Sequence, residues 1–274
     1  KSEERIGKFL SKQGKQANSL FNIATKAAIY SDPETGKRGF NNEGAHLEEE
    51  LDKSLKRMGI DCVDLFYVHR RDHNIEIEEV TESLSNLIKK GKTKSIGYSE
   101  IAPSSLKRAS AIHHIAAVQS EYSLSTRAPE MGLVQACEEL GTALVAFSPV
   151  GRTFLTDSPL SYDFAQTLDF TKVNPRFKQP NYDQNIKISD KFRKYSSDIG
   201  VASATLSIAW LLAKSENIIP IPGTRSVKHL NELAAAMEVD ITDRMISEIE
   251  SILPLGWAYG DRYSDAQWIG PERY

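Results

Sequence analysis

The chain has 274 residues, of which 40% are hydrophobic and 26% are charged, and this composition fits a globular α/β protein with a substantial core. Its 34 Lys and Arg against 37 Asp and Glu give a formal charge of −3, which argues against nucleic acid or a membrane surface as a partner. No stretch approaches the roughly 20 apolar residues of a membrane span, and Cys62 and Cys137 lack metal-ligand spacing, so we expect reduced structural thiols, no metal and a cytoplasmic setting.

Strand-like and helix-like segments alternate along the chain. Short apolar or β-branched runs predict buried strands at 20–25, 63–68, 94–98, 116–120, 142–147 and 218–221. Helical periodicity predicts helices at about 2–13, 46–58, 76–90, 103–112, 131–140, 186–214 (broken near Gly200), 226–237 and 242–251. Ser226 and Thr242 are the expected N-caps of the last two helices. No linker or repeat interrupts this order, so we expect one domain over 1–274.

Alternating strands and helices leave two architectures, a doubly wound sheet and a barrel. The phosphate loop G-x-G-x-x-G of the doubly wound sheet is absent after the first strand, which favours an eight-stranded (β/α)8 TIM barrel. Six strand candidates are two short of eight, and the sequence opens on a helix with no strand before it. We therefore expect an N-terminal β-α-β segment that is absent from this chain.

Polar or functional side chains stand at the carboxyl end of every predicted strand. In chain order these are Lys26, His69, Ser99 with Glu100, Gln119 with Glu121, Phe147 with Ser148, and Gly223 with Thr224 and Arg225. A barrel carries its chemistry at that face, because the loops that follow the strands gather there. The pattern therefore predicts an active site rather than a purely structural barrel.

Each of these residues also has a structural reading. For Lys26 it is the first solvated residue of a loop, and for His69 it is a core histidine with satisfied hydrogen bonds. The neighbouring Arg70 and Arg71 would lower the pKa of His69 and keep its imidazole neutral, which suits hydrogen bonding to a carbonyl. Phe147 fits either a core position or a ring that stacks on a flat ligand.

The segment 221–226 joins the last predicted strand to a helix. A helix N-terminus offers free N–H groups and a positive dipole end, Gly223 permits close approach, and Arg225 is a bidentate donor. The last strands of a barrel are the usual place for a phosphate site. The segment therefore predicts phosphate binding.

Several motifs together resemble the aldo-keto reductase superfamily from end to end. They are IATK at 23–26, DLFYVH at 64–69, GKTKSIGYSE at 91–100, AAVQSEYSL at 116–124, LVAFSPVGRTFLT at 144–156 and IPGTRSVKHLNE at 221–232. They look most like the microbial and plant members related to the potassium-channel β subunits. The resemblance implies a (β/α)8 barrel that binds NADPH and passes a hydride to an aldehyde or ketone.

The family's catalytic set is an Asp, a Tyr, a Lys and a His. Lys26 and His69 match the last two: the lysine lowers the pKa of the tyrosine acid, and the histidine orients and polarises the carbonyl. The Asp and Tyr are expected just upstream of Lys1. A truncated homologue is one alternative, and Tyr67 as a substitute acid is another, although Tyr67 also reads as core.

The resemblance also implies a cofactor site. Ser99 and Gln119 match the clamp on the nicotinamide carboxamide, with Glu100 where many relatives have Asn, and Phe147 matches the ring that stacks on the nicotinamide. The remaining matches are the pyrophosphate loop Ser148, Pro149, Val150, Gly151 and Arg152, the 2′-phosphate contacts Thr224 and Arg225, and the adenine contact Glu232. His229 stands where relatives usually have an Arg, which alters the adenosine site, and NADPH is favoured over NADH.

The tail from about 252 to 274 resembles the family's C-terminal substrate loop, where Trp257 and Tyr263 either line a pocket or pack their rings on the barrel. A small carbonyl compound is the expected substrate, of unassigned identity, and the oligomeric state stays open. The rival function is a regulatory or scaffold subunit that binds NADPH without turnover, like the channel β subunits.

Overall fold

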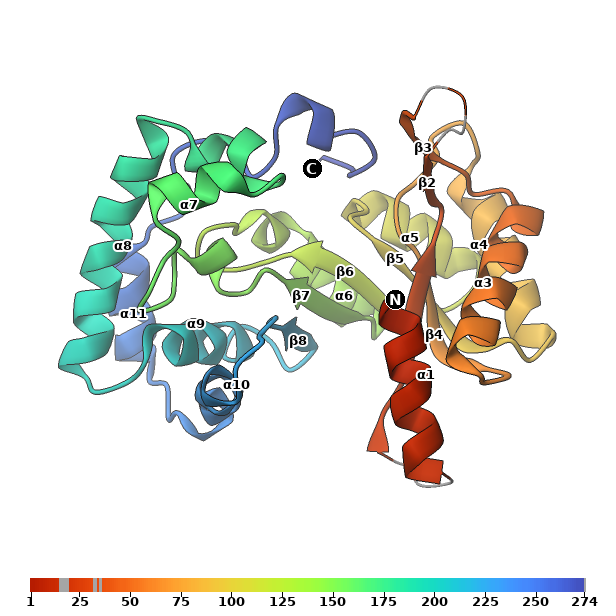
Figure 1. The fold of residues 1–274 in the computed structure, drawn as a ribbon, viewed down its shortest axis with the longest axis horizontal. Coiled ribbons are helices and arrows are strands. Elements are labelled where there is room, and N and C mark those ends of the chain that lie inside the picture. The colour runs from red at the N-terminus through yellow and green to blue at the C-terminus, as the bar shows by residue number, and fades with distance from the viewer. Residues whose placement is uncertain (15–19, 32–33, 35, 274) are drawn as a thin grey trace. The chain divides into compact units, whose positions relative to one another are not determined.

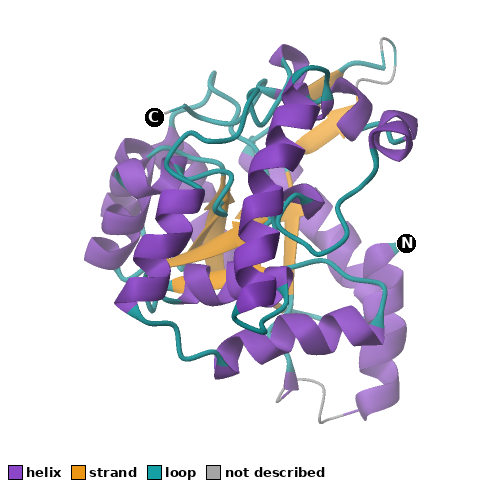
Figure 2. Cartoon of the chain, turned by 90° about the vertical axis from the view of Figure 1, so that its left-hand side faces the viewer, coloured by secondary structure: helices purple, strands orange, loops and turns teal. Residues whose placement is uncertain are grey.

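A computed structural model of the chain describes residues 1–14, 20–31, 34 and 36–273. The chain divides into two compact units. The first comprises residues 1–119, 135–143 and 270–274, and the second comprises residues 120–134 and 144–269. Figure 1 traces the chain from red to blue, and Figure 2 separates its strands, in orange, from its helices, in purple. The expectation of one domain over 1–274 stays a prediction.

A parallel sheet forms the middle of the first unit. Its strands are β1 (Ala24–Ala27), β4 (Val63–Val68), β5 (Thr93–Ser99) and the first three residues of β6 (Ala117–Glu121), paired in that order; the last two residues of β6 belong to the second unit. The predicted strand 63–68 is confirmed to the residue. The first strand begins four residues later than its apolar pattern predicted. In the register of β1 with β4, Lys26 pairs with Tyr67.

Helices of the first unit pack against these strands and against one another. They are α1 (Ser2–Gln13), α3 (Gly44–Met58), α4 (Ile77–Lys89), α5 (Pro103–Ile112) and most of α6 (Leu133–Leu140) (Figure 1). Leu47 and Leu51 of α3 are fully buried, as the apolar stripe of an amphipathic helix requires. The helix ends where Gly59 adopts φ 69°, a left-handed conformation that favours glycine.

Two very short strands were not foreseen from the sequence. They are β2 (Ile29–Ser31) and β3 (Arg38–Phe40), which pair antiparallel as Ile29 with Phe40 and Ser31 with Arg38. The hairpin follows β1 directly along the chain, so it belongs to the segment that leads away from Lys26.

The second unit holds the parallel pair β7 (Ala143–Phe147) and β8 (Ile218–Ile221), joined residue to residue from Leu144 with Ile218 to Phe147 with Ile221. Its helices are α7 (Tyr162–Thr167), α8 (Asn181–Asp198), α9 (Ser203–Leu212), α10 (Val227–Ala234) and α11 (Asp243–Ile252). The predicted break near Gly200 is confirmed, whereas α7 lies in a segment that the sequence left without a helix.

The N-caps of the last two helices are confirmed. The hydroxyl of Ser226 accepts a hydrogen bond from the backbone N–H of His229, and Thr242 does the same for Met245. No helix among the described residues is both long and apolar enough to cross a membrane.

Candidate active site

Lys26 lies near the carboxyl end of β1, and its side chain is half-buried in the first unit. Its Nζ donates a hydrogen bond to Oε1 of Gln119, which lies on β6. The same Nζ is 5.6 Å from the centre of the Tyr67 ring. Two side chains that the sequence placed in the catalytic and cofactor sets are therefore in direct contact.

The surroundings of Lys26 change its ionisation. Burial lowers the pKa of Lys26 to about 8, and the positive charge of Arg70 adds to the effect. With this pKa, a fraction of the Lys26 side chains is neutral near pH 8. A carboxylate or phenolate close to Nζ would raise the pKa and favour the charged form.

His69 follows β4 immediately, and its backbone N–H donates to the carbonyl of Ala27 at 2.8 Å. Burial, followed by the charges of Arg70, Lys26 and Arg38, lowers the pKa of His69 to about 3. The imidazole is therefore neutral at physiological pH, as the sequence predicted.

The prediction about its neighbours was right for one arginine and wrong for the other. The guanidinium of Arg70 acts on His69, but Arg71 is not among the groups that shift it. Arg71 forms an ion pair with Glu272 at 3.5 Å instead. Arg38, on the unforeseen strand β3, supplies the further charge.

Arg70 joins His69 to the next strand. Its Nη1 donates to the carbonyl of His69 at 2.7 Å and to Oγ of Ser99 at 2.9 Å. The backbone N–H of Glu100 then donates to the carbonyl of Gln119 at 2.9 Å. The unit thus gathers the predicted residues of β1, β4, β5 and β6 into one connected group.

Tyr67 shares this group as a buried core residue with 2% exposure. A Cβ added at Gly97 would lie 2.7 Å from the Tyr67 ring, so the ring fills the space that the glycine leaves open. Burial raises the pKa of Tyr67 to about 12, although its contact with Gln119 opposes the change. A raised pKa is the opposite of what an activated acid needs, which argues against Tyr67 as a substitute acid.

In the second unit, Phe147 ends β7 half-buried, and the loop after it has an unusual backbone. Ser148, Arg152 and Thr153 have positive φ angles of 51°, 53° and 84°, and Gly151 has φ 59°. Such angles cost energy for residues other than glycine and persist where the surroundings enforce them. The predicted pyrophosphate loop is therefore held in a strained conformation.

Helix α9 connects this loop to the other predicted cofactor segment. Ser207 Oγ donates to the carbonyl of Pro149 at 2.9 Å, and Thr205 Oγ1 donates to the carbonyl of Glu232 at 2.7 Å. Val150 and Leu233 both pack on one hydrophobic cluster that includes Ile208. The predicted pyrophosphate loop and the predicted adenine contact are thereby tied to the same helix.

The segment between β8 and α10 is exposed at Gly223, Thr224 and Arg225, and His229 in the first turn of α10 is exposed as well. Thr224 Oγ1 accepts a hydrogen bond from the N–H of Ser226 at 3.1 Å, which shapes the turn into the helix. A Cβ at Gly223 would meet no atom within 4 Å. The segment is thus accessible to a ligand. The N–H groups at the start of α10 and the guanidinium of Arg225 are donors suited to an anion.

Trp257 and Tyr263 of the predicted substrate loop are buried, at 6% and 7% exposure. Trp257 Nε1 donates to the carbonyl of Leu124 at 2.7 Å, so its indole is anchored in the protein. The Tyr263 ring stacks edge-to-face on Trp268. Within the second unit, both rings thus pack against the protein, which was one of the two readings left open.

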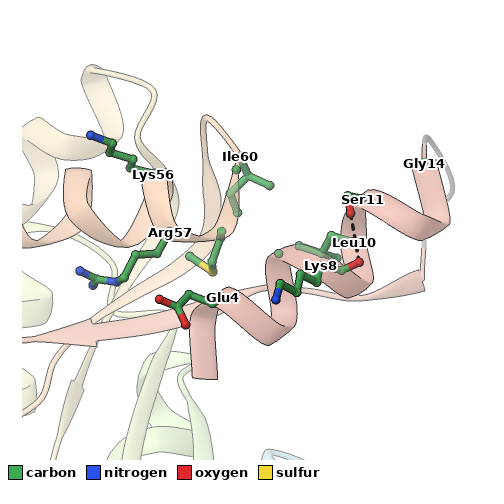
Figure 3. A pocket seen from close by; sticks show the side chains of 11 residues that line it. Glu4, Lys8, Leu10, Ser11, Gly14, Lys56, Arg57 and Ile60 are labelled. Carbon is green, nitrogen blue, oxygen red and sulfur yellow. Dashed lines mark hydrogen bonds between the residues drawn. The ribbon is translucent and has the colours of Figure 1, made fainter. Parts of the chain in front are cut away.

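The first unit has a pocket of about 540 Å³ between α1 and the end of α3, and Figure 3 draws the side chains that line it. It is lined by residues such as Lys8, Leu10 and Ile60. None of the predicted site residues lines it. This pocket is therefore separate from the residues that the sequence predicted at the strand ends.

Comparison with known proteins identifies the family. The chain matches the aldo/keto reductase family over residues 1–254. It is 38% identical over 265 residues to the Schizosaccharomyces pombe protein named aldo-keto reductase yakc [NADP(+)], covering 96% of this chain and 77% of that protein. It is 35% identical over 264 residues to aldo-keto reductase str7 of Strobilurus tenacellus, covering 95% and 76%.

Solved structures agree on the fold. Glycerol dehydrogenase AKR11B4 from Gluconobacter oxydans superimposes with a TM-score of 0.78 at 23% identity, covering 92% of this chain and 76% of that one. The thermostable aldo-keto reductase Tm1743, solved with the inhibitor epalrestat, gives a TM-score of 0.70 at 24% identity, covering 91% and 77%. The fold is therefore the α/β barrel that the sequence predicted. It belongs to the aldo/keto reductase family.

Proposed function

We propose that the protein is an NADPH-dependent reductase that converts an aldehyde or ketone to an alcohol, acting in the cytoplasm on a small carbonyl compound. The observation that carries the proposal is the connected group of Lys26, His69 and Gln119 in a chain of this family. NADPH, when bound, supplies the hydride. The residues of this chain bind, orient and tune the charges around that transfer.

Each member of the group has a proposed task. His69 is neutral, and the N–H of its imidazole can donate a hydrogen bond to the carbonyl oxygen. Lys26 is a cation of lowered pKa that would stabilise the phenolate left by a tyrosine acid. We expect that tyrosine and its aspartate upstream of Lys1, as the resemblance implies.

The second unit offers residues that fit the cofactor. Arg225 and Thr224 are exposed at the N-terminus of α10, where a 2′-phosphate would meet the helix dipole and a guanidinium. The strained loop 148–153 is the proposed pyrophosphate site, and Phe147 is the proposed ring beside the nicotinamide. The printed name of the yakc relative, which includes NADP(+), supports the choice of cofactor.

A substitution at Lys26 tests the proposal. In the full-length protein, Lys26→Met removes the charge beside the acid, and we expect turnover of an aldehyde to fall by roughly 10²-fold, the scale of acid–base catalysis. The measurement is carbonyl-dependent oxidation of NADPH, followed by absorbance. Lys94→Met is the matched control, because Lys94 is 67% exposed and pairs only at the surface with Asp64.

Unchanged turnover in Lys26→Met would contradict the assignment of Lys26. The second candidate function is an NADPH-binding regulatory subunit without turnover. The raised pKa of Tyr67 favours it, since the tyrosine that lies beside Lys26 is a poor acid. Binding of NADPH by the full-length protein with no oxidation by any simple aldehyde would establish that candidate instead.

A further inference from the structure

A buried carboxylate in the second unit carries an inference beyond the proposed catalytic and cofactor residues. Glu121 is the last residue of β6, and its side chain is fully buried. A buried charge is costly unless it is paired and hydrogen-bonded. Its partners therefore indicate what the carboxylate is for.

Three arginines from three separate segments surround Glu121. Arg152, from the loop after β7, donates to its carboxylate, and Arg262, from the C-terminal tail, lies 3.5 Å from it. Arg176, in the 3₁₀ turn Pro175–Phe177, lies 4.0 Å away. Thr126 Oγ1 adds a hydrogen bond at 3.2 Å. Burial alone would raise the pKa of Glu121, but the guanidinium groups outweigh it and lower the pKa, so the group is ionised.

The first of these arginines, Arg152, is part of the strained loop. Arg152 itself has φ 53°, and its guanidinium also lies 4.1 Å from the centre of the Phe170 ring. A residue in such a conformation stays there only when its surroundings hold it. The ion pair with Glu121 and the contact with Phe170 both restrain its side chain.

The second arginine, Arg262, is part of the C-terminal tail. Arg262 lies 4.7 Å from the centre of the Tyr263 ring and 4.6 Å from that of Trp268. Arg152 lies 5.5 Å from the same Tyr263 ring. One carboxylate thus fixes two cations that share an aromatic neighbour, so the loop and the tail are linked through it.

We propose that Glu121 is a positioning residue that holds the loop 148–153 and the tail around Arg262 in the conformation that receives cofactor and carbonyl substrate. The proposal rests on the proposed function for what the two segments bind. It assigns to Glu121 no contact with either ligand. Removing its charge should loosen both segments while the strands and helices of the second unit stay formed.

The test compares two glutamates of the second unit. Glu121→Gln keeps the size of the side chain and removes its charge. Glu130→Gln is the matched control, because Glu130 also pairs with an arginine, Arg127 at 2.7 Å, but that arginine belongs to neither the loop 148–153 nor the tail. In the full-length protein, amide hydrogen exchange reports the opening of each segment, and urea unfolding reports overall stability.

We expect Glu121→Gln to speed exchange across 148–153 and 262–268 by about tenfold or more, while Glu130→Gln does not. The Kd for NADPH, measured by quenching of tryptophan fluorescence, should rise by about tenfold or more in Glu121→Gln alone. Equal exchange in the two variants, or faster exchange spread over the whole unit, would overturn the proposal.

A second variant and a binding measurement on the wild-type protein complete the test. Should Glu121→Gln fail to fold, Glu121→Asp keeps the charge and withdraws it by one methylene, and the same segments should show an intermediate increase in exchange. Wild-type protein that binds no NADPH would refute the proposed function, yet the exchange comparison would still decide whether Glu121 holds the two segments.

Discussion

Burial and neighbouring cations give His69 and Lys26 ionisation properties that free side chains lack. His69 has its pKa lowered to about 3 and Lys26 to about 8, and Arg70 contributes to both shifts. The result is a neutral imidazole beside a cation of reduced basicity. A carbonyl oxygen approaching this group would meet a hydrogen-bond donor and a positive charge.

The shift of His69 has a consequence for stability. Between pH 6.5 and about 3 the unfolded chain binds a proton at this imidazole and the folded chain does not, so stability contributed by neutral His69 is lost as pH falls through that window. Replacing it in His69→Gln removes this loss. We expect the free energy of unfolding of the variant to fall less steeply with acid, by up to about 1.4 kcal/mol per pH unit.

Urea unfolding of the two proteins at a series of pH values measures the difference. Parallel pH dependence in wild type and His69→Gln would show that the imidazole titrates alike in both states, contrary to its buried environment. Above pH 8 the lysine acts in the same direction: the unfolded chain keeps the proton of Lys26 longer, so stability rises with pH toward 10.5.

The sequence predicted Lys26 and His69 because each follows a run of apolar residues that ends at a strand terminus. It did not predict the influence of Arg38, since nothing local shows that a three-residue strand returns this side chain toward His69. Glu121 stood out only as a polar residue at the end of a predicted strand, and its three arginines come from segments distant in sequence.

Helix α10 begins at an N-cap, Ser226, that has a structural role and a proposed role in ligand binding. Ser226 satisfies a backbone N–H of the first turn, and the same turn is the proposed phosphate site. Helix α11 begins at an equivalent cap, Thr242, that has no proposed ligand. The two caps therefore form a natural pair for comparison.

We expect Ser226→Ala and Thr242→Ala each to lower stability by about 1 kcal/mol, the usual value of an N-cap. Only Ser226→Ala should also weaken NADPH binding, by roughly 3- to 10-fold, because it disorders the turn that carries Thr224 and Arg225. Thermal unfolding and fluorescence titration check the two effects. A similar loss of NADPH affinity in Thr242→Ala would place the phosphate site elsewhere.

Long or strongly apolar elements were predicted well, and short ones were not. The strands 63–68 and 218–221 match to the residue because β-branched and aromatic residues fill them. The strands β2 and β3 have three residues each, too few for any periodicity to emerge. Helix α7 has six residues, which is less than two turns, and Ser161 is its N-cap.

At the scale of the whole molecule, the predicted catalytic residues and most of the predicted cofactor residues belong to different units. The first contains the group around Lys26 and His69, and the second contains the strained loop, the start of α10 and the arginines around Glu121. The motifs that predicted the family occur in both. The fold class follows from the matched family and from the solved relatives.

The most direct test of hydride transfer follows the hydrogen itself. Full-length protein is incubated with an aldehyde and NADPH that carries deuterium at the transferring carbon, and the alcohol is examined by mass spectrometry. We predict an alcohol that contains one deuterium and forms in step with NADPH oxidation. NADPH that binds, as shown by tryptophan quenching, yet yields no labelled alcohol from any aldehyde or ketone tested would contradict a reductase and indicate a binding subunit.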